Sequence, residues 1–318
     1  MKIKKVTVTT KERLMCTSTE VPFFIAETRK KGKKSYVIRK GDVVGRSSYG
    51  NDIFFVVEKI IRTDSGQCFA ILKGLTVRIV ADSPVEDLNK IEKEVVENRL
   101  KSLNTKMEDR IRNSSKMNKL FFSEKISGKR LEEKVYSGKI LHLDGDRKYS
   151  EKSIKYYKQL GLDAIVKNIP ENKQAMLVRS LLERYQPDIL VITGHDAMLK
   201  NNGKYNDIYN YRNSRHFINT VKEARKWEPN SDKLVIFAGA CQSYYEAIMM
   251  AGADFASSPA RILIDFIDPL IVAEKIATTS DQEYIRIEDF AGELKGGLEG
   301  IGGVGVKGKQ KTVFYRET

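Results

Sequence analysis

Apolar runs of strand length alternate with amphipathic segments through the second half of the chain. Strand-like runs lie at 139–146, 163–169, 187–196 and 234–241, and 253–258 resembles a fifth strand. Between them, residues 149–160, 171–185, 209–227 and 242–250 repeat apolar positions at helical spacing. Buried-type strands that alternate with helices are typical of a mostly parallel sheet with helices on both faces. The pattern therefore predicts an α/β domain at 135–295.

Upstream of this domain the pattern changes twice. Residues 38–84 hold four or five short segments rich in β-branched and aromatic residues, separated by turns at 49–52 and 63–66. They predict a small SH3-like β-barrel, and the opening Lys40-Gly-Asp is similar to KOW-type barrels. Such barrels bind nucleic acid or protein, although we favour a folding or docking module. Residues 85–134 are highly charged with apolar residues at helical spacing, which predicts a helical connector of one or two amphipathic helices.

The two ends of the chain have distinct compositions. Residues 1–40 carry 12 Lys/Arg and 3 Asp/Glu, so that +9 of the total charge of +14 lies there. A basic segment of this kind can contact nucleic acid, but we favour a solvated and poorly ordered extension at 1–37. The glycine-rich segment 296–318 does not open a helix in an early βαβ unit, so it is no dinucleotide fingerprint. We expect it to be a tail or a loop beside the site.

The numbers of cysteines and histidines and the hydrophobic content limit the kinds of site and protein class that the chain can represent. Among 318 residues there are three widely spaced cysteines, Cys16, Cys68 and Cys241, which excludes a disulfide framework and suggests a reducing compartment. Three histidines make a His-rich metal site a poor candidate, and we predict neither a metal nor a cofactor. The hydrophobic content of 41% is ordinary for a globular protein, and we expect no membrane span and no secretion signal.

Candidate chemistry lies at two strand ends. His195 ends the 187–196 run, and Cys241 ends the 234–241 run after the small residues Gly239 and Ala240, which permit a tight turn. A helix that starts at Gln242 would favour the Cys241 thiolate through its dipole. A right-handed βαβ unit brings both ends to one sheet edge, where a Cys–His dyad can form. The simpler interpretation is a buried small hydrophobe and an unrelated histidine.

Two other functions compete with a Cys–His peptidase. An amidotransferase-like or thiol hydrolase would also use a cysteine in such a turn, but those enzymes place their histidine after the cysteine. No histidine follows His216, which argues against that chemistry. The second alternative is a non-catalytic assembly or nucleic-acid-binding scaffold, in which the α/β domain is degenerate.

Ordered motifs lie along most of the chain, from about Lys40 to the C-terminal glycines. They are Lys40-Gly-Asp-Val-Val, Ser48-Tyr-Gly-Asn-Asp-Ile, Leu72-Lys-Gly-Leu, Leu141-His-Leu-Asp-Gly-Asp, Ile192-Thr-Gly-His-Asp-Ala, Tyr211-Arg-Asn-Ser, Val235-Ile-Phe-Ala-Gly-Ala-Cys-Gln-Ser and Ala256-Ser-Ser-Pro. In these motifs the chain resembles the YabG family, the sporulation-specific proteases of spore-forming Firmicutes.

That resemblance implies a cysteine protease made in the cytoplasm of the mother cell, which processes spore coat and germination proteins. Association with the spore coat is a further expectation from the resemblance. On this basis His195 and Cys241 are the candidate dyad. Self-cleavage remains open.

At fold level the arrangement is similar to caspase-like peptidases, whose His and Cys end adjacent parallel strands. Ala240-Cys241 fits their Ala-Cys pairing. In that group a Gly follows the His and its amide helps to bind the oxyanion, whereas here Gly194 precedes His195 and Asp196 follows it. The resemblance therefore makes the Cys241 amide the safer oxyanion donor, with Gly194, Asp196, Gly239 and Ala240 in supporting positions. We favour Asp196 as a turn residue over a residue that orients His195.

Two acidic residues follow the first strand of the α/β domain. Asp144 and Asp146 lie at the same predicted sheet edge as His195 and Cys241. We hypothesise that one of them lines an acidic pocket for Arg or Lys before the scissile bond. The alternative is a solvated Asp-Gly turn.

Overall fold

The computed structural model describes residues 37–63, 66–124, 132–199 and 205–315. The basic extension predicted at 1–37 therefore lies, except for its last residue, outside the described part. The chain forms two compact units. Of the described residues, the first unit takes those up to Leu72 together with Asp82–Ile91, and the second takes Lys73–Ala81 and everything from Glu92 onward. The segment Lys73–Ala81 thus belongs to the second unit although it connects two strands of the first unit's sheet.

The first unit is built on a five-stranded sheet of order β4-β3-β2-β1-β5. β1 pairs antiparallel with both β2 and β5. The turn predicted at 49–52 is present, and Gly50 and Asn51 adopt the left-handed conformation there, with φ of 64° and 57°. The short strands expected from the β-branched segments are confirmed, while closure into an SH3- or KOW-like barrel stays a prediction. The strands are β1 (Val43–Arg46), β2 (Phe55–Arg62), β3 (Cys68–Gly74), β4 (Val80–Pro84) and β5 (Leu88–Lys90).

A six-stranded sheet of order β13-β11-β10-β9-β7-β8 forms the centre of the second unit. Every pairing is parallel except that of β11 with β13. The mostly parallel α/β sheet predicted from the apolar runs is therefore confirmed. Its strands are β7 (Ile140–Asp144), β8 (Ala164–Asn168), β9 (Ile189–Thr193), β10 (Val235–Ala238), β11 (Phe255–Ser257) and β13 (Ile301–Gly303).

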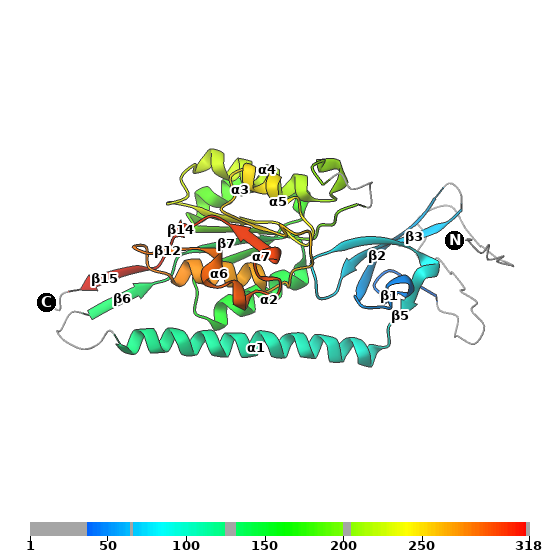
Figure 1. Ribbon diagram of the computed structural model, residues 1–318, viewed down its shortest axis with the longest axis horizontal. Coiled ribbons are helices and arrows are strands. Elements are labelled where there is room, and N and C mark those ends of the chain that lie inside the picture. Colours follow the sequence, from blue (N-terminus) through cyan, green and yellow to red (C-terminus); the bar gives the residue numbers. More distant parts are fainter. Residues whose placement is uncertain (1–36, 64–65, 125–131, 200–204, 316–318) are drawn as a thin grey trace. The chain divides into compact units, whose positions relative to one another are not determined.

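Helices cover both faces of this sheet (Figure 1). Alternate residues of a central strand enter different cores: Ile189 and Val191 of β9 belong to one, Leu190 and Ile192 to the other. This alternation explains why the central strands are continuous apolar runs. One face is covered by α3 (Glu171–Tyr185), α4 (Ser214–Trp227) and α5 (Tyr245–Met250), and the other by α1 (Lys93–Glu124), α2 (Arg147–Gln159) and α6 (Asp268–Thr278).

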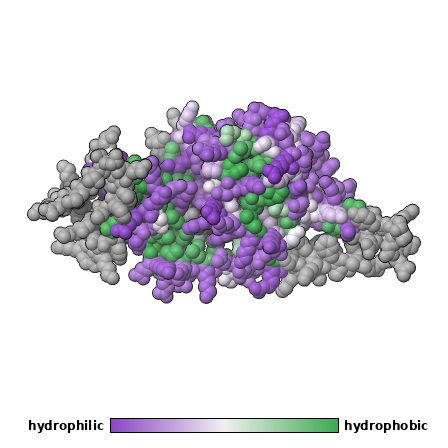
Figure 2. Space-filling view, turned by 180° about the vertical axis from the view of Figure 1, so that it is seen from behind, coloured by the Kyte–Doolittle hydropathy of each residue, from purple (hydrophilic) through white to green (hydrophobic). Residues whose placement is uncertain are grey.

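The charged segment predicted at 85–134 contains the long helix α1. Its Met107 and Ile111 are buried in the same core as α2 and α6. Arg110 forms an ion pair with Glu293, which also pairs with Lys275 at 2.7 Å. The helix therefore packs against the second unit through a narrow apolar stripe, as its spaced apolar residues suggest. Hydrophilic residues dominate the surface seen from behind, with hydrophobic residues showing between them (Figure 2).

The glycine-rich end, expected as a tail or loop, contributes to the sheet. β13 adds an antiparallel edge strand beside β11. A Cβ on Gly303 would lie less than 3.0 Å from Phe255, so only glycine permits this close approach. The other elements here are α7 (Gly297–Gly300), β14 (Val306–Lys307) paired with β12 (Tyr284–Ile285), and β15 (Lys311–Tyr315) paired with β6 (Glu132–Tyr136).

Single-turn 3-10 helices complete the described chain at Ser47–Tyr49, Val85–Asp87, Ile208–Asn210, Ile287–Asp289 and Ala291–Glu293. Within the described ranges, no helix has the length and apolar character needed to cross a membrane.

Candidate active site

His195 and Cys241 follow neighbouring strands at the same edge of the sheet. β9 and β10 pair in parallel with Ile192 opposite Ala238, and each candidate residue lies three positions beyond its member of that pair. The carboxyl ends of parallel strands form the usual ligand-binding edge of an α/β sheet. Both side chains are almost completely buried. The topology therefore places the two residues that the sequence selects at one edge of the sheet.

The Cys241 thiol is enclosed by backbone. Its Sγ lies 3.6 Å from the carbonyl oxygen of Ile264. Burial raises the pKa of the thiol to about 12, although its hydrogen bonds with the backbone of Ile264 and Arg78 and the charge of Arg78 act in the opposite direction. The thiol is therefore neutral at physiological pH in this closed arrangement.

The turn after Cys241 differs from the prediction. α5 begins at Tyr245 and has only 6 residues, so Cys241 does not sit at a helix N-terminus. Residues 239–242 form a tight turn instead, with Gly239 at φ 118° and Gln242 at φ 56°. The Ser243 hydroxyl accepts a hydrogen bond from the Ala240 amide at 2.9 Å, which closes the turn before the helix can start. The dipole argument for a thiolate was therefore wrong.

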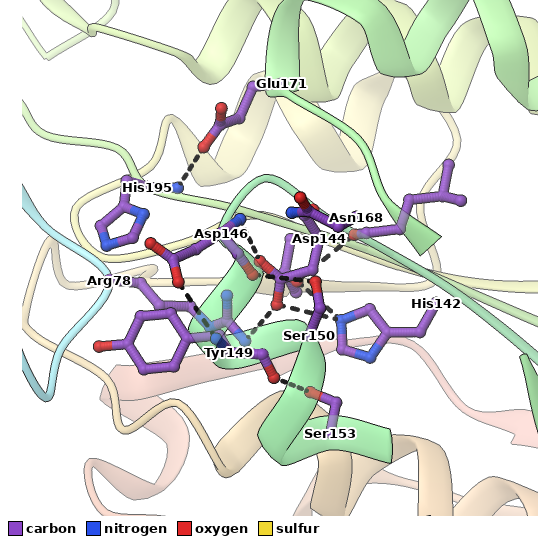
Figure 3. A network of polar contacts seen from close by, with 12 residues as sticks. Arg78, His142, Asp144, Asp146, Tyr149, Ser150, Ser153, Asn168, Glu171 and His195 are labelled. Atoms are coloured by element: carbon purple, nitrogen blue, oxygen red, sulfur yellow. Dashed lines mark hydrogen bonds and ion pairs between the residues drawn. The ribbon is translucent and has the colours of Figure 1, made fainter. Parts of the chain in front are cut away.

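The His195 ring is buried without a hydrogen-bond partner for either nitrogen among the described residues. Its backbone amide donates to Glu171 Oε1 at 2.7 Å (Figure 3). The ring lies beside Tyr149, with centroids 5.6 Å apart. Burial lowers the pKa of His195 to about 4, an effect that nearby Asp146 opposes and the charge of Arg78 reinforces. The imidazole is therefore neutral and free to accept a proton.

The Asp196 carboxylate ties three loops together. It accepts hydrogen bonds from the Asn213 amide at 2.7 Å, the Ser243 hydroxyl at 2.9 Å and the Ser214 hydroxyl. Burial raises the pKa of this carboxyl to about 6, while these hydrogen bonds lower it. These are the contacts of a residue that fixes the turn after His195. Its backbone amide points elsewhere and donates to the carbonyl oxygen of Arg78 at 3.2 Å.

Asp144 and Asp146 have different surroundings. Asp146 caps α2 by accepting a hydrogen bond from the Tyr149 amide at 3.1 Å. Asp144 lies fully buried, and its Oδ2 is 2.8 Å from Nη2 of Arg78, whose side chain is also fully buried (Figure 3). Asp144 is therefore not a solvated turn residue, since it already holds a guanidinium group.

The surroundings of Asp144 contain a second buried histidine. His142 Nε2 lies 2.7 Å from Thr193 Oγ1, and Nδ1 lies 3.2 Å from the Tyr157 hydroxyl. Its pKa is lowered well below the usual value, first by burial and then by the charge of Arg78. His142 is therefore a neutral structural residue beneath the acidic group, fully hydrogen-bonded.

Sequence reasoning missed Glu171, Tyr149 and Arg78. Two glycines are the sequence feature that could have pointed to Glu171. A Cβ on Gly145 or on Gly194 would lie less than 3.0 Å from the Glu171 carboxylate. Both glycines therefore make room for the group that holds the His195 amide. Arg78 gave no local signal, because it lies in a short segment between strands of the other unit's sheet. Among the described residues, no group of three or more His, Cys, Asp or Glu is placed to hold a metal ion.

Comparison with known protein families and with curated proteins points to one family. The family model described as YabG peptidase U57 matches residues 39–314. The chain is 39% identical over 286 residues to the sporulation-specific protease YabG of Bacillus subtilis strain 168, an alignment that covers 84% of this chain and 94% of that protein. No solved structure matches.

Proposed function

Since this chain belongs to the YabG peptidase family and is therefore a protease, we propose that it is a cysteine endopeptidase whose dyad is Cys241 and His195. The observation that carries the proposal is the pairing of β9 with β10, which ends both strands in register at one sheet edge. Both residues are buried at that edge, and an imidazole next to the thiol would supply the base that a cysteine nucleophile needs. We further propose that the mostly parallel sheet is caspase-like.

The proposed reaction is hydrolysis through an acyl-enzyme. The Cys241 thiol gives its proton to His195, and the sulfur attacks the carbonyl carbon of the scissile bond. His195 then transfers that proton to the leaving amine as the C–N bond breaks. Water adds to the remaining thioester, His195 takes one of its protons, and the released sulfur recovers a proton as the carboxylic acid product leaves.

Two backbone amides are suited to bind the oxyanion. One is the amide of Cys241, as the resemblance implies. The other is the amide of Asp196, which already donates to a carbonyl oxygen at 3.2 Å. Gly239 supports the first donor, because its φ of 118° creates the turn before Cys241. Each such donor contributes about 3 kcal/mol of transition-state stabilisation.

The acidic pocket is proposed to select arginine or lysine before the scissile bond. Asp144 supports this specificity, because its carboxylate is fully buried and lies 2.8 Å from a guanidinium nitrogen. A carboxylate in such a site distinguishes a cation from a neutral side chain strongly, since an uncharged occupant leaves the charge unpaired. Asp146 serves the pocket indirectly by capping α2 and by donating its amide to Asp144 at 2.8 Å.

The cellular role follows from the family. The relative in Bacillus subtilis is named a sporulation-specific protease, and we propose that this chain processes spore coat and germination proteins in the mother cell. The test is incubation of the wild-type and Cys241→Ala proteins with a spore-coat extract, followed by gel analysis and N-terminal sequencing of new fragments. Fragments from the wild type alone, with Arg or Lys before each cut, are the expected result. Identical cleavage by the two proteins would refute Cys241 as the nucleophile, and absence of cleavage by both would leave a latent enzyme or a non-catalytic scaffold.

A further inference from the structure

The segment Lys73–Ala81 forms a bent loop, and its residues 77–80 pair with main chain beside the candidate active site. Ile79 forms a parallel β-bridge with Asp196, the residue after His195, and Val77 forms an antiparallel bridge with Asp265. The Val80 amide donates to the Asp196 carbonyl at 3.1 Å, and the Asp196 amide donates to the Arg78 carbonyl at 3.2 Å. A peptide held by main-chain hydrogen bonds on both sides is bound as β-augmentation binds a ligand.

The backbone of Arg78 occupies the reacting position. Its carbonyl oxygen sits on the Asp196 amide, one of the two proposed oxyanion donors. Its backbone also hydrogen-bonds the thiol of Cys241. The peptide bond between Arg78 and Ile79 is therefore presented between the candidate nucleophile and the candidate oxyanion donor.

The side chain of Arg78 fills the acidic pocket. Besides its ion pair with Asp144, the guanidinium lies over the Tyr149 ring, 4.6 Å from the centroid. Its Nε and Nη1 are buried without a hydrogen-bond partner among the described residues. A guanidinium placed for structure alone normally has its donors satisfied, because an unsatisfied buried donor is costly. The unsatisfied donors of Arg78 fit a side chain that occupies a pocket which the arginines of substrates also enter.

We propose that residues 73–81 are an internal pseudosubstrate that keeps the enzyme latent. This inference rests on the proposed function of the same site. Arg78 stands for the arginine before the scissile bond of a protein substrate, and Ile79 for the residue after it. The substrates are then extended segments in which an arginine is followed by a β-branched apolar residue. An external segment of this kind must displace the internal one, whose effective concentration at its own site is high because it is part of the same chain.

Occupation of the site by residues 73–81 explains why the side chains of Cys241 and His195 are enclosed. The thiol and the imidazole are nearly inaccessible to solvent, and the segment hydrogen-bonds the residue that follows His195. When the site opens only in a fraction of molecules, the apparent affinity for an external substrate falls by that fraction. Weakening the internal occupant should therefore raise activity toward peptides.

Arg78→Ala removes the side chain that anchors the segment. We expect hydrolysis of a fluorogenic arginyl peptide to rise about tenfold or more in kcat/KM, because a larger fraction of molecules is open. Arg99→Ala is the matched control, since Arg99 lies exposed on α1, and it should hydrolyse at the wild-type rate. Equal rates for wild type and a folded Arg78→Ala would overturn the proposal. Absence of any Cys241-dependent hydrolysis in every variant would instead refute the proposed function.

A second measurement uses the wild type alone, in case Arg78→Ala does not fold. Acetyl-arginine amide should compete for the acidic pocket and release the segment, which accelerates hydrogen exchange of the Val80 amide. Acetyl-citrulline amide, a neutral compound of the same shape, should leave that exchange unchanged. If the arginine compound inhibits peptide hydrolysis while Val80 stays equally protected, the segment does not occupy the substrate site.

Discussion

The ion pair between Arg78 and Asp144 permits a quantitative test of how the site is built. Its charged atoms are 2.8 Å apart, and both side chains are fully buried. At an effective dielectric constant of about 20, the attraction at that distance is about 6 kcal/mol. Removing water from both groups offsets most of it, so the net pair contributes little. Breaking the pair from one side costs about 3–5 kcal/mol, because a buried charge is left uncompensated.

Asp144→Asn should lower the free energy of unfolding by about 3 kcal/mol, the lower end of that range. The loss is limited because the 73–81 segment can leave its channel and return Arg78 to water. Adding Arg78→Met removes the stranded charge, so the double variant should be more stable than Asp144→Asn alone. A double-mutant cycle over the two positions should give a coupling of about 2 kcal/mol.

Urea unfolding followed by tryptophan fluorescence measures this. The chain has one tryptophan, Trp227 at the end of α4, so the signal reports on the second unit. The control is Glu183→Gln, which breaks an exposed i,i+4 pair with Arg179 at 3.0 Å. That variant should change stability by less than about 0.5 kcal/mol. If Asp144→Asn loses no more than the control, or if Arg78→Met gives no recovery, the pair is not buried in solution.

Three further predictions concern individual residues of the site. Because burial lowers the pKa of His195 from 6.5 to about 4, stability should fall as pH drops through that window, and His195→Gln should reduce the fall in urea midpoint. Burial raises the pKa of Cys241 from 9.0 to about 12, so its stabilising contribution, present below pH 9, is lost as pH rises toward 12, and Cys241→Ala should lose less there in the same assay. Gly194→Ala adds a Cβ less than 3.0 Å from Glu171 and should cost about 1–3 kcal/mol by urea unfolding.

The predictions for His195→Gln and Gly194→Ala each have an internal comparison. Burial raises the pKa of Asp196 to about 6, so its effect on the pH dependence of stability is opposite to that of His195. Asp196 is present in both the wild type and His195→Gln, so its effect cancels when the two are compared. An unchanged pH slope in His195→Gln would mean that the ring is hydrated when folded. Gly292→Ala places its Cβ with nothing within 4 Å and should be nearly neutral. Equal costs for the two alanine variants would mean that Glu171 does not hold the His195 loop.

The apolar pattern by itself determined five of the six strands of the second unit's central sheet. Continuous apolar runs correspond to β7, β8, β9, β10 and β11, because strands covered on both faces have no polar side. Parallel strands place their carboxyl ends on one edge, so the positions of His195 and Cys241 followed from the chain order alone. The motifs around them indicated the YabG family, which the comparisons confirm.

Tertiary structure decided what surrounds those two residues. The Glu171 contact with the His195 amide and the Arg78 contact with Asp144 join segments with no common local pattern. The start of α5 at Tyr245 depended on a serine side chain that closes the turn, which the helical spacing did not reveal. Periodicity reports how a segment is buried, but not which distant segment buries it. That is why the sequence located the candidate dyad, while only the folded chain revealed a peptide bound beside it.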